Sequence, residues 1–382
     1  MKKIVHVFTV SMSLVFLEGL YDKFKKNGYE LIVICSDGYE ARYEESIGNI
    51  KFYPVSMSRG INPIKDLFAL IRIISILKIE KPQVVHGHTP KGGLLAMLAS
   101  KFLSIKNRLY HLHGLKYPGE KGIKRLIIKW MEKTTVKLSA NVFAVSNSLR
   151  EYAINSGLGS AEKISILLNG SVKGIDLKMS EEIRNRKKQL ISELGIKKHN
   201  ITIGFVGRIT EEKGVFELFE AYKRLMELKY DVGLVLCGLM EIKSERNRAL
   251  FDEILKLDGV QYFGQVDNPL EYMVCCDIFV LPSWREGFGL VNIEANSVGV
   301  PVITTDIIGC KDSIENGKTG ILVESKNKDE LIKALEYLIK NTQKRIDMGQ
   351  NGIKRVEMLY DRNAIWDELL NEYNKMVKEV EI

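Results

Sequence analysis

Two glutamates flank a pair of glycines in the stretch 277–302, and these residue types suit the binding of a polar ligand. Glu286 stands directly before Gly287, Gly289 follows shortly after, and Glu294 comes about one helical turn further on. Glycines let the backbone pass close to a ligand and direct amide groups at it from the start of a helix, where the macrodipole favours negative charge. Carboxylates can accept hydrogen bonds from sugar hydroxyls. The stretch therefore predicts a ligand site, with two solvated surface charges as the alternative.

A second group of residues is cationic. Gly207 and Arg208 end an apolar run, and Lys213 precedes the next helical pattern. An arginine binds phosphate oxygens with its planar fork, whereas a lysine acts as a point charge. The spacing fits a diphosphate, and the alternative is a loop of solvated charges.

Several motifs of nucleotide chemistry are missing from the sequence. G-x-G-x-x-G occurs neither after Val206 nor in the first loop, and G-x-x-x-x-G-K-[ST] does not occur. Hydride transfer and P-loop chemistry therefore lose their motif support. The sequence also has no Asp-x-Asp pair that could bridge a diphosphate through a metal ion. We therefore expect neither a metal ion nor a cofactor.

Two pairs of histidines end neighbouring apolar runs in the first half of the chain. His86 and His88 are two residues apart, as are His111 and His113, so each pair would share one face of a strand. Metal ligands can show this pattern, but no third ligand stands at a defined spacing. We expect instead that one histidine of each pair lines a cleft, where a neutral imidazole can hydrogen-bond a sugar hydroxyl or polarise a reacting group. A purely structural role is the alternative.

The elements that position these residues alternate between strand and helix twice along the chain. Short apolar runs predict strands at 4–8, 31–34, 52–55, 84–86, 108–112 and 142–145, and then at 201–206, 232–237, 260–263, 278–281, 302–305 and 320–323. Helical patterns lie between most of them, and residues 361–380 form one amphipathic helical pattern. The alternation predicts two parallel sheets with helices on both faces.

The length of 382 residues exceeds one ordinary core and suits two domains of roughly 150–200 residues each. We place the first domain at 1–175 and the second at 176–360. The fold class is α/β, with two doubly wound, Rossmann-like domains. Ligands of such sheets lie beyond the carboxyl ends of the strands, so two domains that face each other would form a cleft.

Composition narrows the class of protein further. Hydrophobic residues make up 45% of the chain and charged residues 27%, which is typical of globular proteins. Five cysteines without paired ligand spacing indicate buried free thiols in a reducing cytoplasm. The apolar run near the start, residues 4–17, is better explained as a strand entering a helix than as a signal peptide. No later stretch has the length of a transmembrane helix.

The net charge of the sequence is +8, and basic residues are concentrated in one segment. Residues 116–137 carry seven lysines and arginines interleaved with apolar residues that include Trp130. A basic helix that bears an aromatic residue is typical of contact with an anionic membrane surface. The alternative is the solvated face of an ordinary helix. We expect a cytoplasmic protein that binds peripherally to the inner face of the plasma membrane and binds no nucleic acid.

Taken together, these motifs resemble the family-4 retaining glycosyltransferases, whose GT-B fold consists of two Rossmann-like domains facing each other across a cleft. The motifs cover most of the second domain and match the first domain less sharply: 207–208 with 213, 286–294, 304–306, 316–320, 88–93, 111–114 and 169–171. They are similar to members that extend bacterial lipid-linked oligosaccharides, capsules and exopolysaccharides.

The resemblance implies roles for the charged residues. Arg208 and Lys213, beside Gly207, would bind the diphosphate of a nucleotide-sugar donor and stabilise the departing nucleoside diphosphate. Glu294 would hold the ribose hydroxyls, and Glu286 would hold the donor sugar.

The resemblance also implies backbone and first-domain contacts. Amide groups near Phe288, Gly289 and Leu290 would meet the sugar or the phosphate. His113 would lie near the anomeric centre. The helix at 361–380 would pack back on the first domain.

On the acceptor side, the candidate contacts are four residues of the first domain: Ser11, Ser13, His88 and Lys91. The first loop departs from the family, because many relatives carry glycines where this chain has Ser11 and Ser13.

The implied reaction moves a hexose or N-acetylhexosamine from a UDP-sugar to a glycan acceptor linked to polyprenyl diphosphate. The anomeric configuration would be retained through same-face attack, with the donor phosphate helping to deprotonate the acceptor and without a metal. One alternative is a nucleotide-sugar epimerase or hydrolase of the same fold; paired carboxylates often serve hydrolysis. Another is a non-catalytic anionic-lipid-binding protein, which would leave the glutamate pair unexplained.

Overall fold

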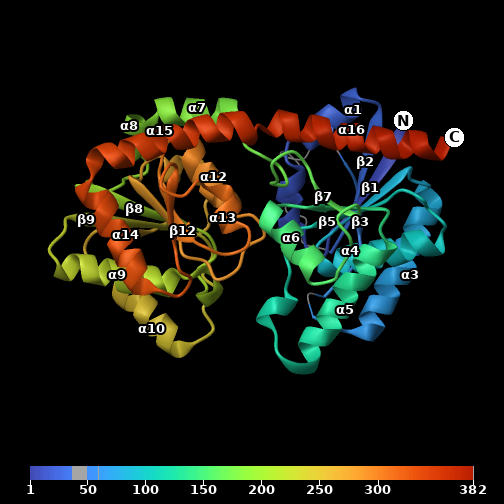
Figure 1. The fold of residues 1–382 in the computed structure, drawn as a ribbon, viewed down its shortest axis with the longest axis horizontal. Helices are drawn as coiled ribbons and strands as arrows, with labels where there is room; N and C mark the ends of the chain where they lie inside the picture. The colour runs from blue at the N-terminus through green and yellow to red at the C-terminus, as the bar shows by residue number, and fades with distance from the viewer. Residues whose placement is uncertain (37–49, 59, 382) are drawn as a thin grey trace. The chain divides into compact units, whose positions relative to one another are not determined.

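The structure is a computed structural model that describes residues 1–36, 50–58 and 60–381, with the backbone alone described for 379–381. The chain forms two compact units (Figure 1). The first unit comprises Met1–Lys173 and Asn363–Ile382, and the second comprises Gly174–Arg362. The sequence-based domain limits of 1–175 and 176–360 stay a prediction.

The first unit contains a parallel sheet of seven strands in the described part of the chain, in the order β3-β2-β1-β4-β5-β6-β7. Its strands are β1 (Lys2–Val7), β2 (Tyr29–Cys35), β3 (Lys51–Pro54), β4 (Val84–His88), β5 (Arg108–Leu112), β6 (Asn141–Ala144) and β7 (Ile164–Ile166). The winding direction reverses between β1 and β4. Ligands of doubly wound sheets bind beyond the strand ends at such a reversal.

Helices cover both faces of this sheet. Successive side chains of a strand point to opposite faces, and here the apolar side chains on each face are buried under helices. Ile4 of β1 belongs to a core with Tyr373, whereas Val5 and Val7 belong to a core with Ile73. The helical segments of the unit are η1 (Ser11–Leu17), α1 (Leu20–Lys26), α3 (Pro63–Glu80), α4 (Pro90–Phe102), η2 (Tyr117–Gly119), α5 (Gly122–Leu138), α6 (Asn147–Asn155) and α16 (Arg362–Glu381). The C-terminal helix therefore contributes to the core of the first unit.

The second unit contains a parallel sheet of six strands within the described residues, in the order β10-β9-β8-β11-β12-β13. Its strands are β8 (Ile201–Val206), β9 (Val232–Cys237), β10 (Val260–Tyr262), β11 (Ile278–Leu281), β12 (Val302–Thr305) and β13 (Gly320–Val323). The winding reverses between β8 and β11. These two strands and β12 are neighbours, so the loops that follow them meet at one edge of the sheet.

The helical segments of the second unit lie on both faces of its sheet (Figure 1). They are α7 (Leu177–Asn185), α8 (Lys187–Glu193), η3 (Glu211–Lys213), α9 (Val215–Glu227), α10 (Glu245–Ile254), α11 (Pro269–Met273), α12 (Leu290–Ser297), α13 (Cys310–Ser313), α14 (Lys328–Lys340) and α15 (Thr342–Leu359).

The predicted class of two parallel-sheet α/β domains is confirmed, and each predicted strand is present with small shifts at its ends. The charged sequence at 180–194 suggests one helix, but the structure has two, because the chain leaves helical geometry at Arg186, which ends α7 and precedes α8. All five cysteines are buried free thiols. Among the described residues, no helix combines the length and the apolar character needed to cross a bilayer.

Candidate active site

Three loops of the second unit, which follow β8, β11 and β12, are held together by close backbone approaches at glycines. A Cβ on Gly214 would lie 1.9 Å from the Pro282 carbonyl oxygen, and a Cβ on Gly309 would lie 2.5 Å from that of Gly287. Both glycines also have positive φ, at 67° and 85°, where side chains are disfavoured. Only glycine fits these two positions, so the sequence fixes how closely the loops pack.

Hydrogen bonds join the loops after β8 and β11. The Glu212 carbonyl oxygen accepts from the Trp284 amide at 2.8 Å and from the Ser283 hydroxyl at 3.0 Å. The Glu212 side chain pairs with Arg285 at 2.9 Å. The residues between these anchors are therefore held at the carboxyl end of the sheet, where ligands of such folds bind.

Lys213 and Glu286 lie within these two loops and form an ion pair. Their side chains are 21% and 15% exposed, so water screens the pair only partly. The thiol of Cys310 lies nearby: burial first, and then the Glu286 carboxylate, raise its pKa to about 12. The sequence suggested a cation for phosphate and a carboxylate for sugar as separate features. The structure brings them into direct contact.

Arg208 has its own acidic partner. Its guanidinium pairs with the Glu241 carboxylate at 2.6 Å, and both side chains are about two-fifths exposed. The Gly207 amide donates to the Cys237 carbonyl oxygen at 2.9 Å, which ties the end of β8 to the end of β9. Glu241 was not predicted from the sequence. It follows the strand that neighbours β8, so the strand order is what places its loop at the same edge of the sheet.

The glycine turn leads into α12 as predicted. Gly289 has a φ of 73° and stands directly before Leu290, the first residue of the helix. The Phe288 side chain is buried against the ring of Tyr360, at a centroid separation of 5.4 Å, so only its backbone can meet a ligand. Glu294 lies about one turn into α12 and is half-buried.

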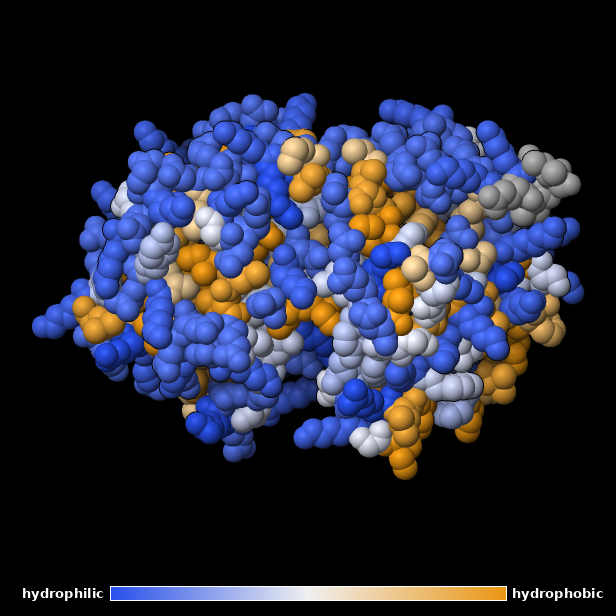
Figure 2. Space-filling view, viewed as in Figure 1, coloured by the Kyte–Doolittle hydropathy of each residue, from blue (hydrophilic) through white to orange (hydrophobic). Residues whose placement is uncertain are grey.

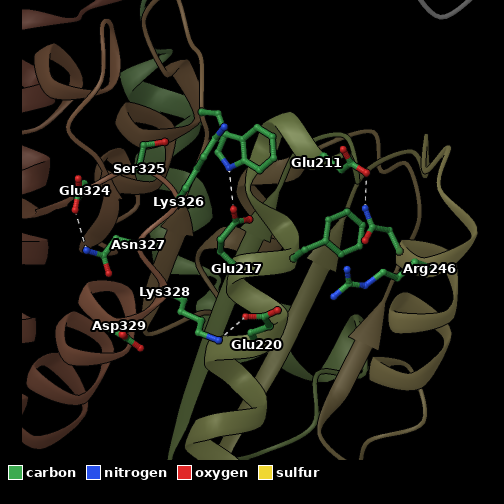
Figure 3. Close-up of a pocket in the computed structure, with 13 residues that line it drawn as sticks. Glu211, Glu217, Glu220, Arg246, Glu324, Ser325, Lys326, Asn327, Lys328 and Asp329 are labelled. Atoms are coloured by element: carbon green, nitrogen blue, oxygen red, sulfur yellow. Dashed lines mark hydrogen bonds and ion pairs between the residues drawn. The ribbon is translucent and has the colours of Figure 1, made fainter. Parts of the chain in front are cut away.

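A separate pocket of about 720 Å³ lies on the second unit (Figure 3). Its charged residues largely bind one another: Lys328 pairs with Glu220 at 3.1 Å, and Lys326 lies 4.0 Å from the centre of the Trp284 ring. The Trp284 ring nitrogen donates to Glu217 at 2.9 Å. The pocket contains none of the predicted donor residues, so we do not place the chemistry there despite its size.

The predicted histidines of the first unit form one cluster together with His6, in which all rings but the half-buried His113 are buried. His88 lies between His6 and His113, with nitrogen–nitrogen distances of 2.9 Å on both sides. His86 and His111 stack at a centroid separation of 5.4 Å. Burial lowers the pKa values of His6 and His111 to about 3 and holds those of His86, His88 and His113 well below the usual range, so all five rings are neutral at physiological pH.

Neutral imidazoles are also metal ligands, and the cluster contains two sets that could hold an ion. In each set one nitrogen per ring lies within 4.8 Å of the others: His6, His86 and His88, and then His88, His111 and His113. The sequence showed only pairs, because the third member of each set comes from another strand.

The four acceptor-side candidates have different surroundings. Ser11 and Ser13 are half-buried in η1. His88 is fully within the cluster. Lys91 is buried, and its ammonium group binds both carboxylate oxygens of Asp66 at 2.6 and 2.9 Å. An acceptor would therefore have to compete with Asp66 for this lysine.

Comparison with known proteins adds two family matches. The sequence model of Glycosyltransferase Family 4 matches residues 15–171, and that of Glycosyl transferases group 1 matches residues 186–355. These regions contain the histidine cluster except His6, and the three loops of the second unit.

Individual relatives match along most of their length. A capsular polysaccharide biosynthesis glycosyltransferase, CapM of Staphylococcus aureus, is 32% identical over 381 residues, which is 100% of this chain and 99% of the relative. A UDP-Gal:α-D-GlcNAc-diphosphoundecaprenol α-1,3-galactosyltransferase of Escherichia coli is 28% identical and covers 81% of this chain and 82% of its own. Among solved structures, an Anabaena protein in complex with UDP-glucose has a TM-score of 0.79 at 19% identity, covering 98% of this chain and 100% of its own.

Proposed function

The chain belongs to the family-4 glycosyltransferases, and from that premise we propose that it transfers a hexose or N-acetylhexosamine from a UDP-sugar to a glycan linked to polyprenyl diphosphate. The proposed transfer retains the anomeric configuration. The Lys213–Glu286 ion pair at the joined loops of the second unit is the observation that supports it most directly.

The ion pair suits a site that waits for a diphosphate. An uncompensated charge in a partly buried position is costly, so in the absence of ligand each charge neutralises the other. An arriving diphosphate competes for the ammonium group of Lys213. The Glu286 carboxylate is then available to accept hydrogen bonds from the hydroxyls of the donor sugar.

The same exchange supports the chemical step. Glycosyl transfer passes through an oxocarbenium-like state while negative charge grows on the leaving diphosphate. Lys213 and Arg208 interact more strongly with that growing charge than with the ground state, which lowers the barrier. Arg208 would leave Glu241 in the same way as Lys213 leaves Glu286.

The remaining donor contacts come from the start of α12. The backbone amides of Phe288, Gly289 and Leu290 would face the sugar or the phosphate, because amides at a helix start favour anions. Glu294 would accept hydrogen bonds from the ribose hydroxyls. We assign no metal ion and no cofactor to the reaction, since the cations of the chain supply the positive charge.

His113 is the proposed contact of the first unit near the anomeric centre. Its pKa is far below the usual range because it is desolvated, with a smaller contribution from His111. It therefore acts as a neutral hydrogen-bonding group and not as a cation. The acceptor hydroxyl would attack from the face that the diphosphate leaves, with a donor phosphate oxygen taking its proton.

The choice of UDP and of a lipid-linked acceptor is supported by the relatives. The Escherichia coli relative is named for a UDP-galactose donor and a diphosphoundecaprenol acceptor, and the Anabaena structure contains UDP-glucose. The CapM relative is named for capsule biosynthesis. These names agree with the donor and acceptor classes implied by the family resemblance.

Contact with an anionic membrane at the inner face of the plasma membrane is the proposed location. The helices α3 and α5 both pack against α4 and carry exposed large apolar side chains, which Figure 2 shows as orange patches. We call this the α3–α5 surface: Ile64, Leu67, Phe68, Ile71, Ile123, Leu126, Ile127 and Trp130.

Basic residues surround these apolar side chains. Lys65 and Arg72 are exposed on α3, and Lys124, Arg125 and Lys133 are exposed on α5. A groove of about 290 Å³ beside α5 is lined by Lys124, Ile128 and Met131 of that helix and by Gly60 and Ile61, which precede α3. On an anionic bilayer, such apolar side chains would enter the lipid–water interface, and the cations beside them would contact the anionic headgroups.

A panel of UDP-sugars tests the proposed function. Purified protein is mixed with each donor, with and without polyprenyl-diphosphate-linked glycans, and UDP release is measured. The proposal predicts release that depends on one donor and on the acceptor. The anomeric configuration of the product, read by NMR, tests retention separately: an inverted linkage would refute the proposed mechanism but not the transfer.

A further inference from the structure

Four of the six histidines and one tyrosine form a continuous hydrogen-bonded chain of polar groups in the first unit, and all of them except the half-buried His113 are buried. The hydrogen bonds start at His86, whose Nδ1 lies 2.5 Å from the Tyr373 hydroxyl on α16. That hydroxyl lies 3.3 Å from His6 Nε2. His6 Nδ1 lies 2.9 Å from His88 Nε2, and His88 Nδ1 lies 2.9 Å from His113 Nε2. The chain therefore links the C-terminal helix to the proposed catalytic histidine.

Each ring in this chain is neutral, as the depressed pKa values above require. A neutral imidazole has one N–H group and one bare nitrogen. If one nitrogen donates, the other must accept. Every hydrogen bond along the chain consequently runs in the same direction, because a Tyr373 hydroxyl that accepted from both neighbouring rings would leave its own buried proton without an acceptor. The tautomer of one ring therefore determines the tautomer of the next.

The His86 end of the hydrogen-bonded chain determines the direction of its hydrogen bonds. His86 Nε2 is buried and has no hydrogen-bond partner among the described residues. A buried N–H group without an acceptor is rarer in proteins than an unpaired acceptor, so Nε2 is the bare nitrogen and Nδ1 carries the proton. His86 then donates to the Tyr373 oxygen, and the Tyr373 hydroxyl donates to His6.

The remaining tautomers follow. His6 Nδ1 donates to His88 Nε2, and His88 Nδ1 donates to His113 Nε2. The only nitrogen of His113 left to carry its proton is Nδ1. The ring of Phe16 stacks on His113 with a centroid separation of 4.8 Å, which restricts the imidazole plane.

We propose that Tyr373 is a positioning residue that, through His6 and His88, fixes His113 in the tautomer with the proton on Nδ1. In that form Nδ1 of His113 can donate a hydrogen bond but cannot accept one. The catalytic importance of this tautomer rests on the proposed function, but the tautomer itself does not.

The test compares Tyr373, which lies on α16, with Tyr29, whose hydroxyl contacts α16 from β2. Tyr373→Phe removes the hydroxyl in the middle of the chain. Tyr29→Phe is the matched control, because its hydroxyl donates to Asn374 on the same helix at 2.6 Å and is not part of the chain. Similar thermal stability of the two variants shows that any difference in tautomer does not come from loss of folding.

The readout is the 15N spectrum of the histidine rings in labelled full-length protein, with the signal of His113 assigned through His113→Gln. A fixed tautomer gives two well-separated nitrogen shifts, and an even mixture of tautomers gives nearly equal ones. We expect the wild type and Tyr29→Phe to show a fixed Nδ1–H form. In Tyr373→Phe we expect the separation for His113 to shrink towards zero.

Three results would overturn the inference. The first is a His113 tautomer that is unchanged in Tyr373→Phe, and the second is a wild-type ring with its proton on Nε2. The third is a stoichiometric metal ion in the purified wild type, because ligating nitrogens of His88 cannot also donate along the chain.

An activity measurement separates this inference from the proposed function. If His113 is catalytic, Tyr373→Phe lowers kcat and leaves KM of the donor unchanged, whereas Tyr29→Phe changes neither. A shifted tautomer with unchanged kcat would leave the inference standing and would refute the catalytic role of His113.

Discussion

Replacing Lys213 by alanine removes one half of the Lys213–Glu286 ion pair and leaves a carboxylate without its partner. Exposed pairs contribute roughly 0–1 kcal/mol, whereas breaking a buried pair costs roughly 3–5 kcal/mol. With about a fifth of the lysine side chain and less of the glutamate exposed, this pair lies between those limits. We therefore expect the free energy of unfolding to fall by about 2 kcal/mol.

The expected effect on activity is separate. Removing one preorganised group that stabilises transition-state charge raises the barrier by roughly 2.7–4 kcal/mol, a loss in kcat of about 10²–10³. The double variant Lys213→Ala/Glu286→Gln distinguishes the two effects. It removes the uncompensated charge, so it should recover most of the lost stability and none of the lost activity.

Both quantities are measurable with purified protein, unfolding by urea titration and turnover by UDP release. Near-normal turnover of Lys213→Ala would refute the diphosphate role of this lysine. Equal stability of the single and double variants would show that the lone carboxylate costs nothing, and the reasoning about the ion pair would be wrong.

Three further predictions concern other parts of the chain. Arg208→Ala should lower kcat by about 10²–10³ in the same UDP-release assay while the melting temperature stays close to that of the wild type, because its pair with Glu241 is exposed and contributes little to stability. Glu294→Ala should weaken the affinity for UDP in calorimetry, and an unchanged affinity would remove its ribose role. On the α3–α5 surface, Leu126→Ser/Trp130→Ser should reduce sedimentation with anionic vesicles without changing UDP affinity, and binding equal to that of the wild type would exclude this surface as the membrane contact.

Much of the fold was predictable because the strands of both sheets are buried runs bounded by turn residues. The strand Ile278–Leu281 and the turn through Gly289 into α12 show this directly. The strand Ile164–Ile166 was not predicted, since three residues give too short an apolar run. The helix Thr342–Leu359 was also missed, because its charged residues hide its narrow apolar face.

The sequence suggests candidate site residues by their type, but it does not identify the side chains that they contact. Lys213 and Glu286 are 73 positions apart, and only the neighbouring placement of β8 and β11 brings them together. The link between His86 and Tyr373 spans 287 positions and depends on the C-terminal helix packing on the first sheet. Spacing along the sequence carries no information on such contacts. Topology does, once the strand order is known.

The most direct test of the proposed transfer is the mass of the acceptor after the reaction. The protein is incubated with a UDP-sugar, with or without a polyprenyl-diphosphate-linked glycan, and the lipid-linked product and released UDP are measured by mass spectrometry. We predict that the acceptor gains one sugar, that an equal amount of UDP appears, and that both changes vanish in Lys213→Ala/Arg208→Ala. Conversion of the donor without an acceptor, or an unchanged acceptor with every donor of the panel, would contradict the account.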